Sequence, residues 1–286
     1  MIDIKLLEQL CLCNGISGDE GNVRNLIINE IKDCADDIKT DNLGNLIVFK
    51  KGKKSAKSKL MVSAHMDEVG LMVTDITSDG YLKFDEVGGI DRRVLPGKRV
   101  CVGRNGLKGV IGVKPIHLTN GDEKTAVPKM NDMYIDIGAE SREDALKYVN
   151  HGDSINFEGD FKINGKTVVT KALDDRFGCY VLINLIKSEP EYDMYFTFVV
   201  QEEVGLRGAR PAAFTVNPDF ALVIESTTAA DVAEVDVSHQ VCNLSKGATV
   251  TVMDRATVYD KEMISAAFEL AEKNNIAVQY KRAVAG

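Results

Sequence analysis

Two adjacent glutamates, Glu202 and Glu203, have the clearest capacity for chemistry in this sequence. They follow the apolar run 194–200, which predicts a buried strand, and Gly205 lies two residues further on. Like charges at a strand end are costly to bury unless a cation or a catalytic role retains them. Since successive side chains of an extended chain point to opposite sides, the pair predicts one metal ligand and one proton carrier. A solvated acidic turn is the alternative.

Other potential ligands also follow apolar, strand-like segments of the sequence. They are His65 with Asp67 after residues 60–64, Asp174 with Asp175 after 167–170, and Glu225 after 220–224. In open α/β sheets ligands bind outside the carboxyl ends of the strands, so we expect these side chains at one edge of a sheet. Histidine and carboxylates suit Zn, Co or Mn, and several carboxylates in one pocket indicate more than one cation. Polar strand caps without a function are the alternative.

The elements that must position these residues alternate between strands and helices. A capping box from Ser17 to Glu20 predicts a helix that continues to about residue 36. Strands follow at 45–49 and 60–64, and we interpret the basic loop 50–59 between them as a solvated hairpin tip. The same β/α alternation resumes at residue 167 and includes a short helix within 206–214.

The segment between the two halves has a different character. Short β-like runs alternate with turns from Val69 to about Asn164, with one helix near residues 142–149. We therefore predict an α/β protein, a mixed sheet flanked by helices, with an inserted mostly β domain at 69–164. The catalytic domain would be discontinuous, comprising residues 1–68 and 165–286.

Composition limits the classes of function. The chain has 286 residues, 44% hydrophobic and 27% charged, with no apolar run long enough to span a bilayer. A formal net charge of −8 argues against nucleic acid as the main partner. Six cysteines without a C-x-x-C pair favour reduced thiols, and the N-terminus lacks the pattern of a secretory signal. We therefore expect a cytoplasmic protein that binds neither membrane nor nucleic acid.

Four motifs together resemble a known enzyme family. They are Ser63-Ala64-His65-Met66-Asp67-Glu68, Lys171-Ala172-Leu173-Asp174-Asp175-Arg176, Gln201-Glu202-Glu203-Val204-Gly205 and Glu225-Ser226-Thr227-Thr228. The chain resembles, from near residue 1 to its last residue, the glutamyl aminopeptidases that form tetrahedral particles, also called TET aminopeptidases. Some members of this co-catalytic metallo-aminopeptidase family once carried the label endoglucanase. The resemblance implies a zinc-peptidase core of the phosphorylase/hydrolase-like type and a dimerisation domain at the β insertion.

The resemblance also implies a role for each residue. His65 and Glu225 would hold one metal ion, Glu203 the other, and Asp174 would bridge them, so that two divalent ions, Zn or Co, bind per subunit. Glu202 would be the general base, and Asp67 would orient His65. The implied reaction removes N-terminal residues from a peptide, and the implied assembly is a homo-oligomer, either a dimer or a tetrahedral dodecamer.

One departure from the family concerns the C-terminus. Relatives continue past the counterpart of residues 283–286 and supply a histidine for the metal held by Glu203, and His239 is a poor substitute because it falls in a loop-like stretch. The sequence is thus expected to be either an incomplete record or a chain defective at one metal. A related zinc carboxypeptidase or deacylase, and a non-catalytic or inactive assembly subunit, are the alternative functions.

Overall fold

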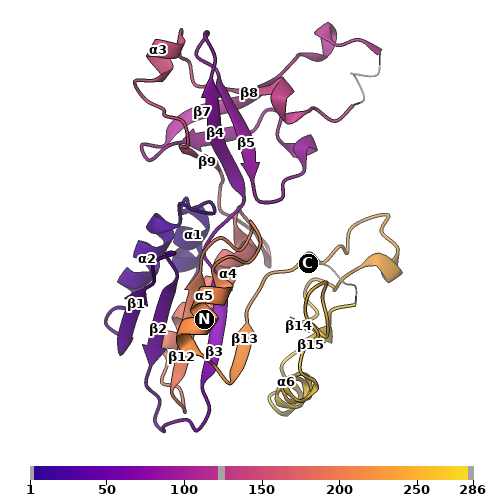
Figure 1. Cartoon of the computed structure of the whole chain (residues 1–286). Helices are drawn as coiled ribbons and strands as arrows, with labels where there is room; N and C mark the ends of the chain where they lie inside the picture. Colours follow the sequence, from indigo (N-terminus) through magenta and orange to yellow (C-terminus); the bar gives the residue numbers. More distant parts are fainter. Residues whose placement is uncertain (1–2, 122–125, 283–286) are drawn as a thin grey trace. The chain divides into compact units, whose positions relative to one another are not determined.

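The computed structural model of the chain describes residues 3–121 and 126–282 (Figure 1). The predicted C-terminal departure at residues 283–286 lies outside the described residues. The chain divides into two compact units, residues 1–225 and 226–286. The candidate site residues all belong to the first unit.

A five-stranded mixed sheet forms the centre of the first unit. Its order is β1 (Asp37–Thr40), β2 (Leu46–Lys50), β12 (Met194–Val199), β3 (Leu60–His65) and β13 (Phe220–Val223). β12 and β13 both run parallel to β3, whereas β2 is antiparallel to β1 and β12. The carboxyl ends of three parallel strands therefore lie at one edge of the sheet. The predicted α/β class with a mixed sheet is confirmed.

Helices cover both faces of this sheet (Figure 1). On one face the apolar stripes of three helices pack against alternate residues of β2, β3 and β12, including Val48, Val62 and Phe196. On the other face Val216 packs against Ile47 and Met61. The helices of the first face are α1 (Ile4–Leu12), α2 (Gly21–Ile31) and α4 (Leu173–Lys187), and that of the second is α5 (Ala209–Val216).

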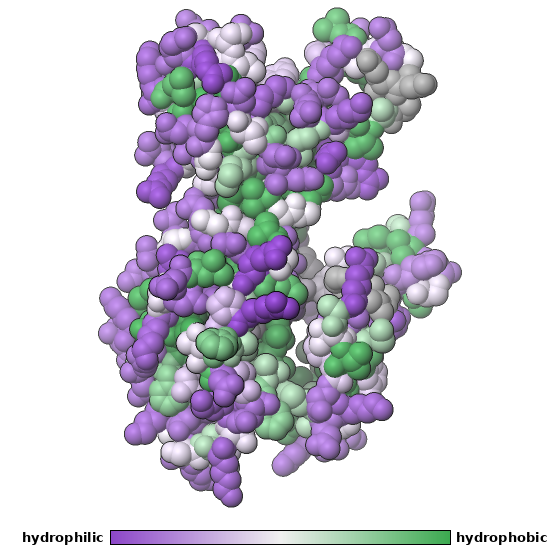
Figure 2. Space-filling view, viewed as in Figure 1, coloured by the Kyte–Doolittle hydropathy of each residue, from purple (hydrophilic) through white to green (hydrophobic). Residues whose placement is uncertain are grey.

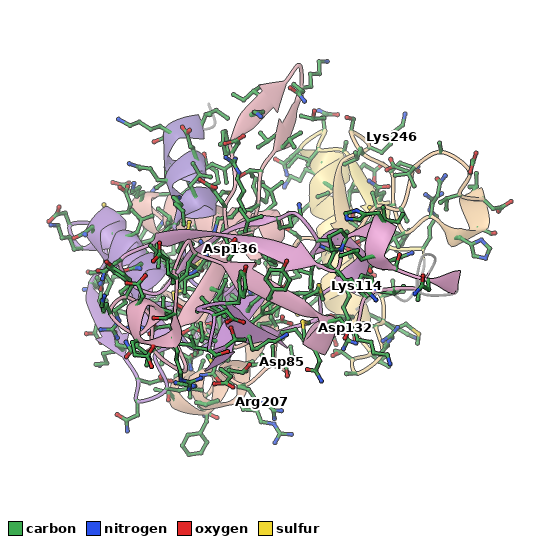
Figure 3. The ribbon with its side chains drawn as sticks, turned by 90° about the horizontal axis from the view of Figure 1, so that it is seen from above. Asp85, Lys114, Asp132, Asp136, Arg207 and Lys246 are labelled. Carbon is green, nitrogen blue, oxygen red and sulfur yellow. The ribbon has the colours of Figure 1, made fainter. Side chains whose placement is uncertain are left out.

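A closed six-stranded barrel lies in sequence between β3 and α4. Its order is β4 (Gly70–Ile76), β5 (Leu82–Val87), β8 (Met133–Asp136), β7 (Leu107–Val113), β6 (Arg99–Val102) and β9 (Ser154–Phe157). Residues alternate between the apolar interior, such as Leu82 and Phe84, and the exterior, such as Asp85 and Asp136 (Figure 3). The barrel thus has its own core.

Short elements complete the two units. In the first unit they are η1 (Arg92–Val94), η2 (Ile116–Leu118), η4 (Met130–Asp132), α3 (Arg142–Ala145) and the hairpin of β10 (Lys162–Asn164) with β11 (Thr167–Val169). The second unit contains η5 (Val237–His239), β14 (Ala248–Val250), α6 (Lys261–Lys273) and β15 (Val278–Tyr280), with β14 parallel to β15. None of the described helices is long and apolar enough to cross a bilayer. Hydrophilic residues predominate on the face shown in Figure 2.

Two local predictions are wrong. β2 and β3 do not form a hairpin, because β12 inserts between them and pairs with both. Ser17 and Glu20 do not form a capping box either: α2 begins at Gly21 without a side-chain cap hydrogen bond. Both side chains instead bind backbone or side-chain groups near the candidate site.

Candidate metal centre

His65, at the end of β3, lies among carboxylates. Its side chain is 2% exposed, and its Nε2 atom lies 3.1 Å from Asp174 Oδ1 and 3.5 Å from Glu225 Oε1. One donor atom from each of these three residues lies within 4.8 Å of the other two. Glu225 follows β13, which is paired with β3, so the parallel strands bring it beside His65. The three residues form a cluster able to hold a metal ion.

Asp174 reaches the cluster from an unexpected element. β11 belongs to a separate two-stranded hairpin, so the prediction that Asp174 follows a strand of the central sheet is wrong. Ala172 adopts a left-handed conformation (φ 54°), and Asp174 and Asp175 are non-helical residues at the start of α4. The half-buried Lys171 and the buried Arg176 flank this abrupt turn, and both contact the Glu68 carboxylate.

Asp67 is fully buried and binds three groups. Its carboxylate accepts hydrogen bonds from Ser17 Oγ (2.6 Å) and from the backbone amides of Glu202 (3.0 Å) and Glu203 (3.1 Å). Its Oδ1 atom lies 3.4 Å from His65 Nδ1, which also contacts the backbone carbonyl of Asp67 at 3.0 Å. Asp67 therefore joins the histidine to the glutamate pair, and these contacts fix the orientation of the imidazole.

Glu202 and Glu203 lie in a turn rather than on a strand. β12 ends at Val199, Gln201 is left-handed (φ 54°), and the amides of Gly205 and Leu206 both donate to the Glu202 carbonyl. The strand alternation expected for the pair therefore does not apply. Glu202 Oε2 nevertheless lies 4.0 Å from His65 Nε2, whereas Glu203 lies outside the three-residue cluster.

Two buried side chains to which the sequence assigned no role at the site support this turn. Asn45 accepts a hydrogen bond from the Val200 amide (3.0 Å) and donates to the Gly208 carbonyl (2.9 Å), on either side of the glutamate pair. Glu20 accepts one from the Gln201 amide (3.1 Å). The sequence signal for the role of Asn45 was its position directly before the apolar run of β2. An amide that is fully buried there must find hydrogen-bond partners within the protein.

The electrostatics of the site favour a positive charge at its centre. Burial lowers the pKa of His65, but hydrogen bonds to Asp174, Asp67 and Glu225 outweigh it and raise that pKa well above its ordinary value. Burial raises the pKa of Glu202 and of Glu225, and that of Glu203 to about 7, and the neighbouring carboxylates add to the effect. A bound cation would relieve this repulsion.

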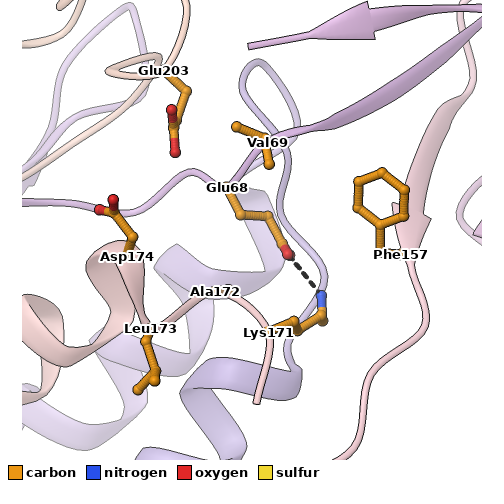
Figure 4. A pocket seen from close by; sticks show the side chains of 8 residues that line it. All are labelled: Glu68, Val69, Phe157, Lys171, Ala172, Leu173, Asp174 and Glu203. Carbon is orange, nitrogen blue, oxygen red and sulfur yellow. Dashed lines mark hydrogen bonds and ion pairs between the residues drawn. The ribbon is translucent and has the colours of Figure 1, made fainter. Parts of the chain in front are cut away.

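A pocket of about 280 Å³ adjoins the cluster (Figure 4). The carboxylates of Asp174 and Glu203 point into the same space, and Lys171 pairs with Glu68 at the opposite wall. The remaining lining residues are Val69, Phe157, Ala172 and Leu173. Asp174 thus contributes both to the His65 cluster and to the pocket that contains Glu203.

The donor set fits divalent metal ions. It consists of one imidazole nitrogen and carboxylate oxygens, with no thiolate in the cluster, which suits Zn or Co better than a soft-metal site. Asp175 Oδ2 is a buried atom without a hydrogen-bond partner among the described residues, and burial raises the pKa of Asp175 to about 9. The site therefore holds more acidic groups than it can leave ionised without a cation.

The sequence of this chain is similar to those of known aminopeptidases. The model of the M42 glutamyl aminopeptidase family matches residues 44–286. A lysyl aminopeptidase of Pyrococcus furiosus is 34% identical over 290 residues, which cover 98% of this chain and 81% of that protein. The family match covers more than half of the chain, including each candidate site residue.

Solved structures agree with these matches. A TET aminopeptidase from a marine sediment archaeon of the Thaumarchaeota superposes with a TM-score of 0.93 at 33% identity, covering 99% of this chain and 82% of that one. A TET1 peptidase of Pyrococcus horikoshii, described as assembling into a tetrahedron or a large octahedral shell, gives a TM-score of 0.85 at 41% identity, with 97% and 83% covered.

Proposed function

Because the chain belongs to the M42 glutamyl aminopeptidase family, we propose that this aminopeptidase removes N-terminal residues from peptides at a centre of two divalent ions, zinc or cobalt. The observation that carries the proposal is the convergence of His65, Asp174 and Glu225 donor atoms within 4.8 Å beside the glutamate pair. His65 and Glu225 would hold one ion, Glu203 the other, and Asp174 would bridge them.

Divalent ions bound there supply Lewis-acid activation of water and of the scissile carbonyl. The chain supplies the proton transfers. Glu202 is the proposed general base, since its Oε2 atom lies 4.0 Å from His65 Nε2 and burial raises its pKa, which makes its carboxylate a stronger proton acceptor. The Asp67 carboxylate contacts the His65 ring and accepts hydrogen bonds from the backbone amides of Glu202 and Glu203. It therefore fixes the position of the proposed base relative to the proposed ligands.

The β barrel at residues 69–164 is the proposed dimerisation domain of a homo-oligomer, a dimer or a tetrahedral dodecamer. Its surface exposes large apolar side chains that a partner subunit would cover, including Val94, Ile116 and Leu118. Residues 1–68 and 165–286 would form the catalytic domain. Six free cysteines fit a reducing compartment, and we place the protein in the cytoplasm.

Matched peptides test the proposed activity. The purified protein with added Zn²⁺ or Co²⁺ is incubated with one peptide in free-amino, N-acetylated and C-amidated forms, and the products are identified by mass spectrometry. We expect loss of N-terminal residues from the free-amino and C-amidated forms and none from the acetylated form. Release of C-terminal residues, or removal of the acetyl group, would instead identify a carboxypeptidase or a deacylase.

A further inference from the structure

We propose that the pocket lined by Glu68, Phe157 and Lys171 receives the side chain of the substrate's N-terminal residue and selects an uncharged side chain of moderate size. This inference rests on the proposed aminopeptidase function and concerns its specificity. It follows from the place, the charge balance and the apolar wall of the pocket.

The place of the pocket links it to the bond that is cut. Asp174 and Glu203 line it, and both are proposed metal ligands, so a peptide carbonyl bound at the centre would lie beside this pocket. Its volume of about 280 Å³ is at the lower limit of the roughly 300–1,000 Å³ of pockets for drug-sized ligands, which fits a small group such as a single side chain. An aminopeptidase has one residue on the N-terminal side of the scissile bond, while the rest of the peptide must extend into solvent.

The charged groups of the far wall are paired with groups of the protein itself. Lys171 Nζ donates to both carboxylate oxygens of Glu68, at 2.7 and 3.0 Å, and to Asn14 Oδ1 at 3.2 Å. Glu68 is also 3.4 Å from the guanidinium of Arg176, which is fully buried. Glu68 and Lys171 are 5% and 12% exposed, so neither has a free charge to offer. An acidic or basic side chain entering the pocket would lose hydration without gaining an ion pair.

The apolar wall sets the accepted size. Val69, Phe157 and Leu173 are partly exposed residues of the lining, and Phe157 belongs to β9 of the barrel. The insertion thus contributes a specificity residue in addition to its proposed role in assembly. In an apolar pocket one methylene group of the substrate changes kcat/KM by about 10- to 200-fold, so the Phe157 ring is sufficient to discriminate between side chains.

Steady-state kinetics on aminoacyl p-nitroanilides of Leu, Met, Phe, Glu and Lys test the proposal. For the zinc- or cobalt-supplemented protein we expect kcat/KM for Leu and Met to exceed that for Glu and Lys by about 10-fold or more. Glu68→Gln should raise the Glu/Leu ratio about 10-fold, because Lys171 then carries an unbalanced charge. Lys171→Met should raise the Lys/Leu ratio, and Phe157→Ala should raise the Phe/Leu ratio.

Matched variants away from the pocket control for general effects. Glu30→Gln breaks a comparable ion pair, that with Lys187, and Phe214→Ala truncates a ring that is 89% exposed, so both should keep the wild-type ratios. Unchanged ratios in the Glu68, Lys171 and Phe157 variants, or a wild-type preference for a charged residue, would overturn the inference while leaving the aminopeptidase function intact. Absence of cleavage of every substrate by the wild type would count against the function itself.

A binding measurement on the wild-type protein tests the proposal even if the variants do not fold. Calorimetric titration of the wild-type protein with the free product amino acids should give a Kd for L-leucine at least about 10-fold below those for L-glutamate and L-lysine. Equal affinities, or tighter binding of a charged amino acid, would refute the selection of an uncharged side chain independently of any substitution.

Discussion

His65 receives contacts from carboxylates on both sides of its ring. Asp67 faces Nδ1, while Asp174, Glu225 and Glu202 face Nε2. The buried Asp67 therefore fixes the orientation of the ring through Nδ1, and Nε2 points toward the carboxylates of Asp174, Glu225 and Glu202. This division is the arrangement in which an imidazole binds a metal through one nitrogen and a supporting carboxylate through the other.

Glu202→Gln tests the division of labour within the glutamate pair. We expect kcat to fall by about three orders of magnitude while bound metal is retained, because the amide keeps the shape of the side chain and loses the ability to accept a proton. Turnover and metal content are measured on the same preparation. The exposed Glu189→Gln is the control. Loss of metal, or turnover close to that of the wild type, would show that Glu202 is not the base.

Glu20 gives a pH-dependent prediction. Burial raises the pKa of Glu20, so its folded form binds a proton more tightly than its unfolded form. The resulting stabilisation is complete below the ordinary glutamate pKa of about 4.3 and is lost as the pH rises through the raised value. Glu20→Gln imitates the protonated form and should therefore increase Tm relative to the wild type, by more at pH 8 than at pH 4.

Thermal melts across that pH range measure this difference, with the exposed Glu262→Gln as the control. A decrease of Tm that is larger at pH 8 than at pH 4 would mean that the ionised carboxylate is required to hold the Gln201 amide. In that case the turn would depend on the charge of Glu20 rather than on its hydrogen bonds.

The sequence predicted which candidate ligands lie together better than it predicted which residues support them. His65, Asp174 and Glu225 were expected together because polar ligand types followed apolar runs, and the structure brings them together. Ser17 and Glu20 were assigned to a helix cap, since a local pattern cannot show that their partners would be Asp67 and Gln201, distant in sequence. Hydrogen bonds between residues so far apart in sequence leave no periodic pattern in the sequence that could predict them.

At the scale of elements, the site depends on how three strands end and how one helix begins. Continuous apolar runs predicted β2, β3, β12 and β13 as strands, yet they could not predict that β12 lies between β2 and β3. Strand order follows from which faces the helices cover, which is a tertiary property. The unexpected start of α4 has the same origin, because Asp174 does not follow a strand of the central sheet, and the neighbouring Lys171 and Arg176 both contact Glu68, which is distant in sequence.

Gly208→Ala tests the support of the glutamate turn. A Cβ atom at Gly208 would lie 2.4 Å from both Asn45 Oδ1 and the Val200 carbonyl oxygen, so the Asn45 side chain would be displaced. We expect the free energy of unfolding to fall by about 1–3 kcal/mol and kcat to fall with it. Gly89→Ala, where a Cβ meets nothing within 4 Å, should change stability by less than about 0.5 kcal/mol. Equal effects of the two substitutions would contradict the proposal that Asn45 supports the turn that carries Glu202 and Glu203.

At the scale of the whole molecule, assembly is expected to use the barrel. Light scattering coupled to size exclusion should give a mass that is a multiple of 31.3 kDa. The double substitution Ile116→Asp with Leu118→Asp should lower this mass, because it places charges on an apolar barrel surface that a partner would bury. Val258→Asp, in the second unit, alters an apolar residue that is more exposed than Ile116 or Leu118 and serves as the control. A monomeric wild type would exclude the proposed oligomer.

Metal content per chain is the most direct measurement of the proposed centre. Plasma mass spectrometry after zinc or cobalt loading and desalting should give two ions per chain for the wild type. Fewer ions are expected for His65→Ala and for Glu203→Gln, while Glu202→Gln retains both. A wild type without bound metal, or a His65→Ala variant with undiminished content, would contradict the assignment of His65, Asp174, Glu203 and Glu225 as ligands.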